Sequence, residues 1–191
     1  MLDVATTLFV RQGYAATSLE QIARVAECSK ASLYRRYSCK AALFKAVVAA
    51  RGAHLLEEAR AVEACSRDPL LATREIALFF LDFMLRPETT EAYRIVIADG
   101  HRIPSVVDDM MATSVEPFVA TISRLLKAAA DAGHIESTDH EETTRVLMGL
   151  VLGWPLQNTL LGQNKMLDPQ ARQRFFDRAW QVFLSGIRRA P

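Results

Sequence analysis

The stretch Thr17-Ser-Leu-Glu-Gln-Ile-Ala-Arg-Val-Ala-Glu-Cys-Ser-Lys-Ala-Ser-Leu-Tyr-Arg-Arg-Tyr37 decides the fold of the N-terminal part of the chain. It predicts two short helices, over residues 18–26 and 29–37. Thr17 to Glu20 has the pattern of a capping box at the start of the first helix, and Ser29 is a suitable cap for the second. Two such short helices, separated by so brief a turn, are too small to fold alone and indicate a helix-turn-helix.

The second of these helices is predicted to carry a polar outer face. With Leu33 directed inward and a rotation of about 100° per residue, four side chains point farthest from the core. They belong to Ala31, Ser32, Tyr34 and Arg35, with Lys30 and Arg36 on the flanks. A guanidinium, a phenol, a hydroxyl and a methyl group can all meet base edges in the major groove. Arg36 could equally be a solvated surface charge, and Tyr37 is expected in the core.

Charge is unevenly distributed along the chain. Residues 1–51 carry eight Lys and Arg against three Asp and Glu, a net charge of +5, whereas the remainder carries 15 against 19, a net charge of −4. A basic module joined to a mildly acidic body favours a nucleic-acid partner.

The whole chain is predicted to be helical. Apolar residues recur at spacings of three and four throughout, and no stretch alternates long enough for a strand. The first stripe, at the N-terminus, stops at Gly13, and a fourth helix starts near Lys40. Beyond residue 65 the helices lengthen, with breaks expected at Asp68-Pro69, Arg86-Pro87, Ile103-Pro104, Gly133 and Asp168-Pro169. We therefore expect an all-α fold, with a three-helix DNA-binding domain over 1–48 and a helical effector-binding and dimerisation domain over 49–191.

Residues 2–44 contain a set of characteristic positions at fixed spacing, namely Leu2-Asp3-Val4-Ala5, Phe9, Gly13-Tyr14, Thr17, Ile22-Ala23, Ala26, Ser29-Lys30, Leu33-Tyr34, Tyr37, Lys40 and Ala42-Leu43-Phe44. In these positions the chain resembles the N-terminal domain of the TetR family of transcriptional regulators. The resemblance implies that Thr17 and Lys40 hold DNA phosphates from two helix starts. It also implies that Lys30, Ala31, Ser32, Tyr34 and Arg35 face the groove, in agreement with the helical wheel.

The chain departs from the family pattern in three respects. Glu27 and Ala31 occupy positions where the family often has glycine, and a non-Gly residue in a left-handed turn costs about 1 kcal/mol. Ser38-Cys39 replaces the common Pro-Ser before Lys40. The sequence also starts directly at the first helix, without the usual basic arm. Whether such an arm contacts the minor groove is therefore an open question.

The second half of the chain is expected to bind a small organic effector. The stretch from Ala92 to Pro104 resembles the start of the AefR-like regulatory domain of a TetR subgroup. The residues predicted to line an effector pocket are Phe79, Phe83, Arg94, Trp154 and Asn158, and either Arg94 or His101 could supply the charge for an anionic group. Plain core packing, with Arg94 in a structural ion pair, is the alternative for each of them.

The last two helices are predicted to form a homodimer contact. Gly149 and Gly153 would allow close approach, and Phe176, Trp180 and Phe183 share one apolar face. Two such helices from each subunit would make a four-helix interface, which is also where the family resemblance places it.

Several classes of protein are not favoured by the sequence. It shows no signal peptide and no membrane span, which makes a cytoplasmic location the expectation. The three cysteines and four histidines lack metal-ligand spacing, so no metal and no cofactor are predicted. A small helical enzyme would need a nucleophile, a carboxylate pair or a phosphate loop, and none stands at usable spacing. The leading hypothesis is a DNA-binding, ligand-responsive repressor that acts as a homodimer on double-stranded operator DNA; a DNA-binding scaffold without an effector is the other alternative.

Overall fold

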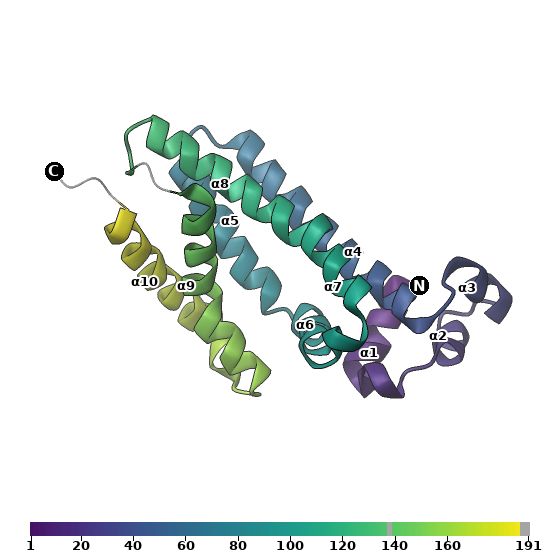
Figure 1. Ribbon diagram of the computed structural model, residues 1–191. Coiled ribbons are helices and arrows are strands. Elements are labelled where there is room, and N and C mark those ends of the chain that lie inside the picture. The colour runs from purple at the N-terminus through teal and green to yellow at the C-terminus, as the bar shows by residue number, and fades with distance from the viewer. Residues whose placement is uncertain (137–138, 188–191) are drawn as a thin grey trace. The chain divides into compact units, whose positions relative to one another are not determined.

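The computed structural model describes residues 1–136 and 139–187, and within that range the chain forms helices and no strand (Figure 1). The α-helices are α1 (Leu2–Ala16), α2 (Leu19–Val25), α3 (Lys30–Arg36), α4 (Lys40–Cys65), α5 (Pro69–Met84), α6 (Pro87–Asp99), α7 (Pro104–Met110), α8 (Glu116–Asp131), α9 (His140–Leu160) and α10 (Pro169–Ile187). Short 3-10 helices cover Gly100–Arg102 and Asn164–Leu167, and a π-helix covers Met111–Val115. The all-α prediction is confirmed, and none of the described helices is long and apolar enough to cross a membrane.

The helix starts follow from local sequence signals. Four of the α-helices begin at a proline, namely α5, α6, α7 and α10, as the predicted breaks required. Proline suits the first turn because its missing N–H has no partner there in any case. Asp68 caps α5 by accepting hydrogen bonds from the backbone N–H groups of Leu70 and Leu71. Pro155 lies inside α9, and the helix continues through it.

The chain divides into two compact units. The first unit consists of Met1–His54 and Pro87–Val115, and the second consists of Leu55–Arg86 and the residues from Glu116 onward. The first unit therefore adds α6 and α7 to the four N-terminal helices. This division describes packing, and the functional division into 1–48 and 49–191 stays a prediction.

The core of the first unit gathers the inward faces of its short helices. Phe9 and Phe44 are buried with their rings edge to face, 5.6 Å between centroids. Ile22 from α2 and Leu33 from α3 are fully buried in the same cluster, which also includes Ile95 from α6. Because α2 and α3 are only seven residues long each, this shared burial rather than intrinsic helix propensity stabilises them.

Helix α1 contains a kink at the predicted stop. Gly13 has a φ of 81°, which lies in the left-handed region that glycine adopts without strain, and helical geometry resumes up to Ala16. The regular helix that starts at Leu2 therefore stops at Gly13, as the sequence predicted, and a short helical turn follows it up to Ala16.

A second glycine permits a close approach within the first unit. Gly52 of α4 lies against Ser114 of the π-helix, and a Cβ atom at position 52 would overlap the Ser114 side chain. The Ser114 hydroxyl is buried there without a hydrogen-bond partner. The two segments therefore pack at a distance that only glycine allows.

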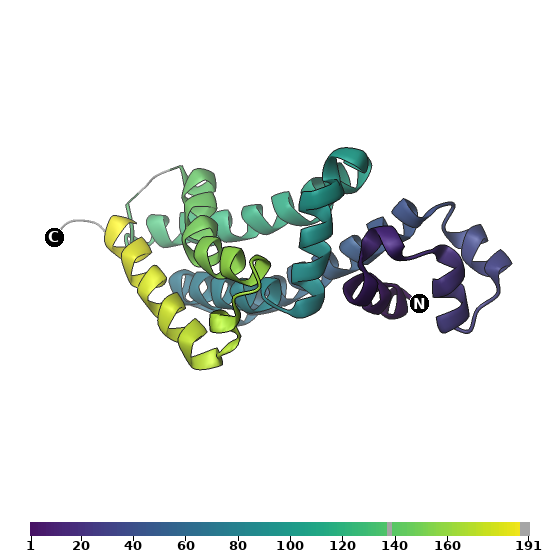
Figure 2. The same ribbon diagram turned by 90° about the horizontal axis from the view of Figure 1, so that it is seen from below.

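The second unit is built around α5, which packs against both α8 and α9. Its core includes Ile76, Leu81, Phe118, Leu126 and Phe176, all almost fully buried. Helices α9 and α10 lie side by side at the C-terminal end of the chain, in green and yellow in Figure 2. An ion pair between Arg74 on α5 and Asp177 on α10, 2.5 Å long, joins two of these elements at the surface.

Candidate nucleic-acid interface

Helices α2 and α3 form the helix-turn-helix that the sequence predicted, shifted by one residue at its start. The cap of α2 is Ser18, whose hydroxyl accepts from the backbone N–H of Gln21, while the Gln21 side chain accepts from the Ser18 N–H. The capping box is thus formed by Ser18 and Gln21 rather than by Thr17 and Glu20. Ser29 caps α3 as expected, by accepting from the N–H of Ser32 at 3.1 Å.

The turn between the two helices is strained at one residue. Glu27 has a φ of 51°, the one non-Gly residue with a positive φ among the described residues. This is the left-handed position at which the sequence predicted a conformational free-energy cost for a residue other than glycine. Ala31 lies inside α3 with ordinary helical geometry, so the other departure from glycine carries no such cost.

The outer face of α3 is exposed along its length. Leu33 is fully buried and Tyr37 is 8% exposed, which orients the helix as the wheel predicted. Four of the predicted groove-facing residues are exposed and Ser32 is half-buried; the exposed ones are Lys30, Ala31, Tyr34 and Arg35. The chemistry of this face is therefore available to a partner.

Tyr34 carries a hydrogen bond that the sequence did not predict. Its hydroxyl donates to the carboxylate of Glu20 on α2, with 2.6 Å between the oxygens. This bond lowers the pKa of Glu20, and the same bond raises the pKa of Tyr34. No spacing rule links residues 20 and 34, because they meet only when α2 and α3 pack.

Lys40, at the start of α4, is engaged with the end of α1. Its ammonium group donates to the carbonyl oxygens of Tyr14 and Ala15, at 2.6 and 3.2 Å, and lies 4.4 Å from the centre of the Tyr14 ring. Burial lowers the pKa of Lys40, and the nearby Asp99 carboxylate opposes that shift. An ammonium group has three N–H donors, so one remains beyond these two carbonyls.

Thr17 has a structural role instead of the phosphate contact that the resemblance implied. Its side chain is 2% exposed, and its hydroxyl donates to the carbonyl of Gly13 at 2.7 Å. A buried hydroxyl whose proton is already donated cannot donate to a phosphate. The bond instead closes the end of α1 after its kink.

The residues predicted for the effector pocket fall into both compact units. In the second unit, the rings of Phe79 and Phe83 stack at 6.2 Å, and the Arg86 guanidinium lies 5.7 Å from each ring centre. Trp154 is 58% exposed, and its carbonyl accepts from the buried Asn158 amide. Arg94 belongs to the first unit, is exposed, and pairs with Glu91 at 3.2 Å.

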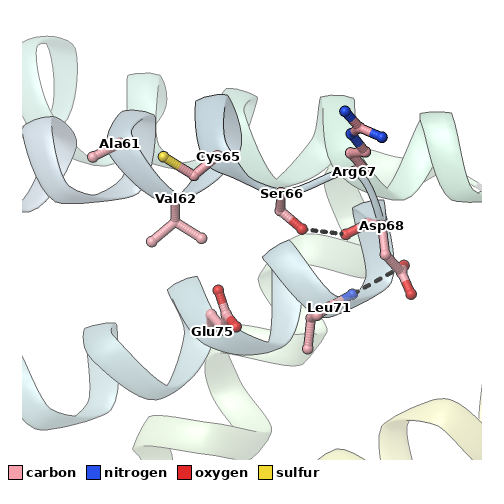
Figure 3. A pocket seen from close by; sticks show the side chains of 8 residues that line it. All are labelled: Ala61, Val62, Cys65, Ser66, Arg67, Asp68, Leu71 and Glu75. Atoms are coloured by element: carbon pink, nitrogen blue, oxygen red, sulfur yellow. Dashed lines mark hydrogen bonds between the residues drawn. The ribbon is translucent and has the colours of Figure 1, made fainter.

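A groove in the second unit lies where no effector residue was predicted. It has a volume of about 610 Å³ and lies at the turn from α4 to α5, where Val62, Cys65 and Leu71 supply apolar surface (Figure 3). Asp68 and Glu75 add carboxylates to its lining. Figure 3 shows two hydrogen bonds at this turn, from the Ser66 hydroxyl to the Asp68 carbonyl and from the Leu71 N–H to the Asp68 carboxylate.

The residues predicted for the dimer contact separate into two groups. Phe176, Trp180 and Phe183 are at most 7% exposed and form an aromatic row inside the core of the second unit. Buried side chains cannot contact a partner subunit, so the prediction that these three residues form the dimer contact is wrong. They belong to the core of the second unit. The reason is that α10 needs its largest apolar face to pack on α5 and α9. Gly149 and Gly153 are exposed and stay candidates.

The exposed apolar surface of α9 and α10 was missed by the sequence reasoning. Val146, Leu150 and Trp154 follow one another at intervals of four on α9 and are 53%, 37% and 58% exposed, and Val182 on α10 is 49% exposed. A groove of about 320 Å³ runs between the two helices beside them. The interval of four between these residues of α9 was the available signal.

Within the described residues, no group of three or more His, Cys, Asp or Glu side chains could hold a metal ion. The three cysteines carry no disulfide.

Comparison with protein families covers most of the chain. Residues 1–47 match the family described as bacterial regulatory proteins, tetR family, and residues 72–186 match the AefR-like transcriptional repressor, C-terminal domain. Both resemblances stated from the sequence are thereby confirmed.

Individual relatives match over most of the chain. The uncharacterized HTH-type transcriptional regulator YvkB of Bacillus subtilis is 24% identical, over 98% of this chain and 95% of its own. The HTH-type transcriptional regulator SrpR of Pseudomonas putida is 25% identical, over 80% of this chain and 70% of its own. A solved structure, of a putative TetR-family regulator from Mesorhizobium loti, has a TM-score of 0.87 at 21% identity and covers 98% of this chain and 95% of that one.

Proposed function

The chain belongs to the TetR family of bacterial regulatory proteins and is a DNA-binding transcriptional regulator. We propose that it acts as a homodimeric repressor of a pseudo-palindromic operator. A small organic effector releases the repressor from the DNA. The observation that carries the proposal is the outer face of α3, exposed and polar on one side while Leu33 is fully buried on the other. A location in the cytoplasm, with the operator, is part of the proposal.

In this proposal α3 enters the major groove. Arg35 and Lys30 supply positive charge, Ser32 and Tyr34 supply hydrogen-bonding oxygens, and Ala31 supplies a methyl group. Lys40 uses two of its N–H groups for the carbonyls of Tyr14 and Ala15 and contacts a phosphate with the third. A phosphate contact positions the helix-turn-helix on DNA but does not read bases. Thr17 is left out of the contact set because its hydroxyl is committed to Gly13.

The proposed dimer uses the outward faces of α9 and α10. Val146, Leu150 and Trp154 form an apolar stripe there, with Gly149 and Gly153 beside it. Burying such a stripe is favourable by about 25 cal/mol per Å² of apolar surface. Two copies that join α9 and α10 would form a four-helix contact, and each would contribute one α3 to the operator.

The proposed effector is largely apolar with one anionic end. Phe79 and Phe83 are the aromatic surface that supports this, and the Arg86 guanidinium lies over both rings as a partner for an anionic group. Asn158, a buried polar residue of the same unit, stays a prediction as a further effector contact. The effector acts only if it prefers the conformation that binds DNA poorly, since equal affinity for both conformations shifts nothing.

Operator selection from random duplexes tests the DNA-binding part of the proposal. We expect a pseudo-palindrome with half-sites about 34–36 Å apart along the DNA axis, or a multiple of that spacing. The affinity should fall by roughly 10³-fold or more between 50 and 200 mM salt if six or more phosphates are contacted. Recovery of no preferred sequence at either salt concentration would contradict the proposal.

A screen of aromatic and aliphatic acids for release of the selected DNA tests the effector part. A tenfold loss of operator affinity requires about 1.4 kcal/mol of coupling, and the operator must weaken effector binding by the same factor. Phe79→Ala is the variant of choice because Phe79 is only partly buried, whereas Phe83 is a core residue. Leu78→Ala, which truncates another partly buried apolar residue of α5, is the matched control. If Phe79→Ala responds like the parent to an identified effector, the effector site lies elsewhere.

A further inference from the structure

The contact between α2 and α3 places a carboxylate next to the outer face of α3. Glu20 is the second residue of α2 and Tyr34 is in the middle of α3, and both side chains are exposed on the surface of the first unit. Their 2.6 Å hydrogen bond joins a carboxylate to the same α3 face that is proposed to enter the major groove. Carboxylates are disfavoured beside DNA phosphates, so the placement of one there calls for a reason.

The direction of the hydrogen bond is determined by the chemistry of the two groups. A phenol has one proton, and an ionised carboxylate has none. The Tyr34 hydrogen bond holds the pKa of Glu20 below its usual value of 4.5, and the bond to Glu20 raises the pKa of Tyr34 above 10.0. At neutral pH the carboxylate therefore accepts and the phenol donates. Neither side chain then has a proton left for a hydrogen bond to a third group.

The pair consequently offers only lone pairs to a third group. The Tyr34 oxygen keeps its acceptor capacity, and the Glu20 carboxylate has several further acceptor positions. In the major groove, cytosine and adenine present an exocyclic amino group that donates, whereas guanine O6 and N7 and thymine O4 accept. Phosphate oxygens also only accept. An acceptor-only pair is thus attracted to amino groups and repelled by the other edges.

We propose that Glu20 and Tyr34 together form a reading pair that selects a base with an exocyclic amino group, cytosine or adenine, at one position of each operator half-site. Glu20 has two roles in this pair. It accepts a hydrogen bond from the base, and it also accepts the hydrogen bond of the Tyr34 hydroxyl, so that Tyr34 cannot donate to guanine, thymine or a phosphate. The inference rests on the proposed entry of α3 into the major groove.

A purely structural role for this bond makes a different prediction. If Glu20 only held α3 against α2, its loss would change the stability of the domain and weaken binding to every sequence by the same factor. If Glu20 only repelled phosphates, its neutralisation would strengthen binding to every sequence. Neither role changes which base is preferred at a single position.

The test is operator selection with the full-length parent and three variants at one salt concentration. Glu20→Gln keeps an oxygen that can accept from Tyr34 and adds an amide donor in place of the second carboxylate oxygen. Glu27→Gln is the matched control, because it removes the same charge from the same helix-turn-helix at an exposed residue without touching Tyr34. Tyr34→Phe keeps the ring and removes the hydroxyl.

We expect the parent to require cytosine or adenine at one position of each half-site. Glu20→Gln should accept guanine or thymine there, with a change in relative affinity of about tenfold. Tyr34→Phe should reduce the preference at the same position. Glu27→Gln should strengthen binding to all sequences alike and leave the preference unchanged. Thermal unfolding of each variant verifies that the domain is folded.

Two results overturn the inference. One is a Glu20→Gln variant that selects the same bases as the parent, and the other is a variant whose affinity changes equally for all sequences, as expected of Glu27→Gln. A parent protein that selects no sequence at all would instead show that the proposed DNA-binding role of the α3 face has failed.

Discussion

The ammonium group of Lys40 lies 4.4 Å from the centre of the Tyr14 ring and donates a 2.6 Å hydrogen bond to the Tyr14 carbonyl. Because Lys40 is the first residue of α4 and Tyr14 lies just after the kink in α1, this contact joins the two helices that flank the helix-turn-helix. The position of α2 and α3 is therefore held from both sides.

Replacement of Lys40 by methionine should lower the stability of the N-terminal helix-turn-helix region. The variant keeps the aliphatic stem and removes the donors to the Tyr14 and Ala15 carbonyls. We expect a loss of roughly 1 kcal/mol of unfolding free energy, since hydrogen bonds to charged groups contribute about 1.5–3 kcal/mol and partial exposure reduces this. Urea denaturation measures the loss. Lys30→Met, at an exposed position of α3, should leave the unfolding free energy unchanged; equal stability of both variants would show that the contact contributes nothing.

Replacement of Glu27 by glycine should stabilise the protein. Glu27 has a left-handed φ of 51°, which costs a non-Gly residue about 1 kcal/mol and costs glycine nothing. We expect a gain of up to about 1 kcal/mol in the urea unfolding free energy. Ala31→Gly is the control, because position 31 is helical and glycine should destabilise it by about 1 kcal/mol. A loss of stability in Glu27→Gly would contradict this account of the turn.

Replacement of Gly52 by alanine should destabilise the first unit, because the added Cβ would overlap the Ser114 side chain. Overpacking of this kind typically costs about 1–3 kcal/mol. Ser114→Gly removes the overlapping atoms, so the double variant should recover stability relative to Gly52→Ala alone. The coupling is measured by a double-mutant cycle in urea, and additive effects of the two substitutions would show that the residues are not in contact.

Acidification should remove the contribution of the Glu20–Tyr34 pair. The pKa of Glu20 is lower in the folded protein than its ordinary value of 4.5, chiefly because of the Tyr34 hydrogen bond. The stabilisation is therefore complete above pH 4.5 and is lost as the pH falls through the lowered folded pKa. The difference in thermal midpoint between the parent and Tyr34→Phe should accordingly shrink on going from pH 6 to pH 3. A difference that stays constant over that range would argue against the pair.

Substitution of Trp154 by aspartate should separate the proposed dimer without unfolding the chain. Trp154 is 58% exposed on α9, so a charge there is tolerated by the folded protomer but not by a buried interface. Trp180→Asp should instead unfold the protein, because Trp180 is 7% exposed in the core. Sedimentation measures the oligomeric state, and circular dichroism measures folding. Leu71→Asp, at an exposed apolar residue of α5, is the control, and an unchanged dimer in Trp154→Asp would place the interface elsewhere.

The helices could be predicted from the sequence because their signals are local. Ser29 caps α3 through a hydrogen bond that spans three residues, and proline at the start of α5, α6, α7 and α10 acts through its own ring. The orientation of α3 was equally predictable, since Leu33 is its one buried residue and the helical period determines the rest. The assignment of the outer face followed from these two facts.

The candidate site could be predicted only in part. The cap of α2 was placed one residue early, since Thr17 and Ser18 are both good caps and the choice depends on the Thr17 hydrogen bond to Gly13. The partners of Tyr34 and Lys40 were not predicted, because they are 14 and 26 residues away along the chain. Contacts at such separations depend on how helices pack.

The sequence by itself determined the helix positions, the helix-turn-helix and the family, because caps, prolines and the helical period act within a few residues of one another. Only the tertiary structure decided which apolar face of α10 is core and which face of α9 is open. Phe176 and Trp154 are both large aromatic residues on amphipathic helices, yet one is fully buried and the other is 58% exposed. Burial depends on the neighbours that pack in space, and the apolar patterns along α9 and α10 did not by themselves specify which of their faces would be covered.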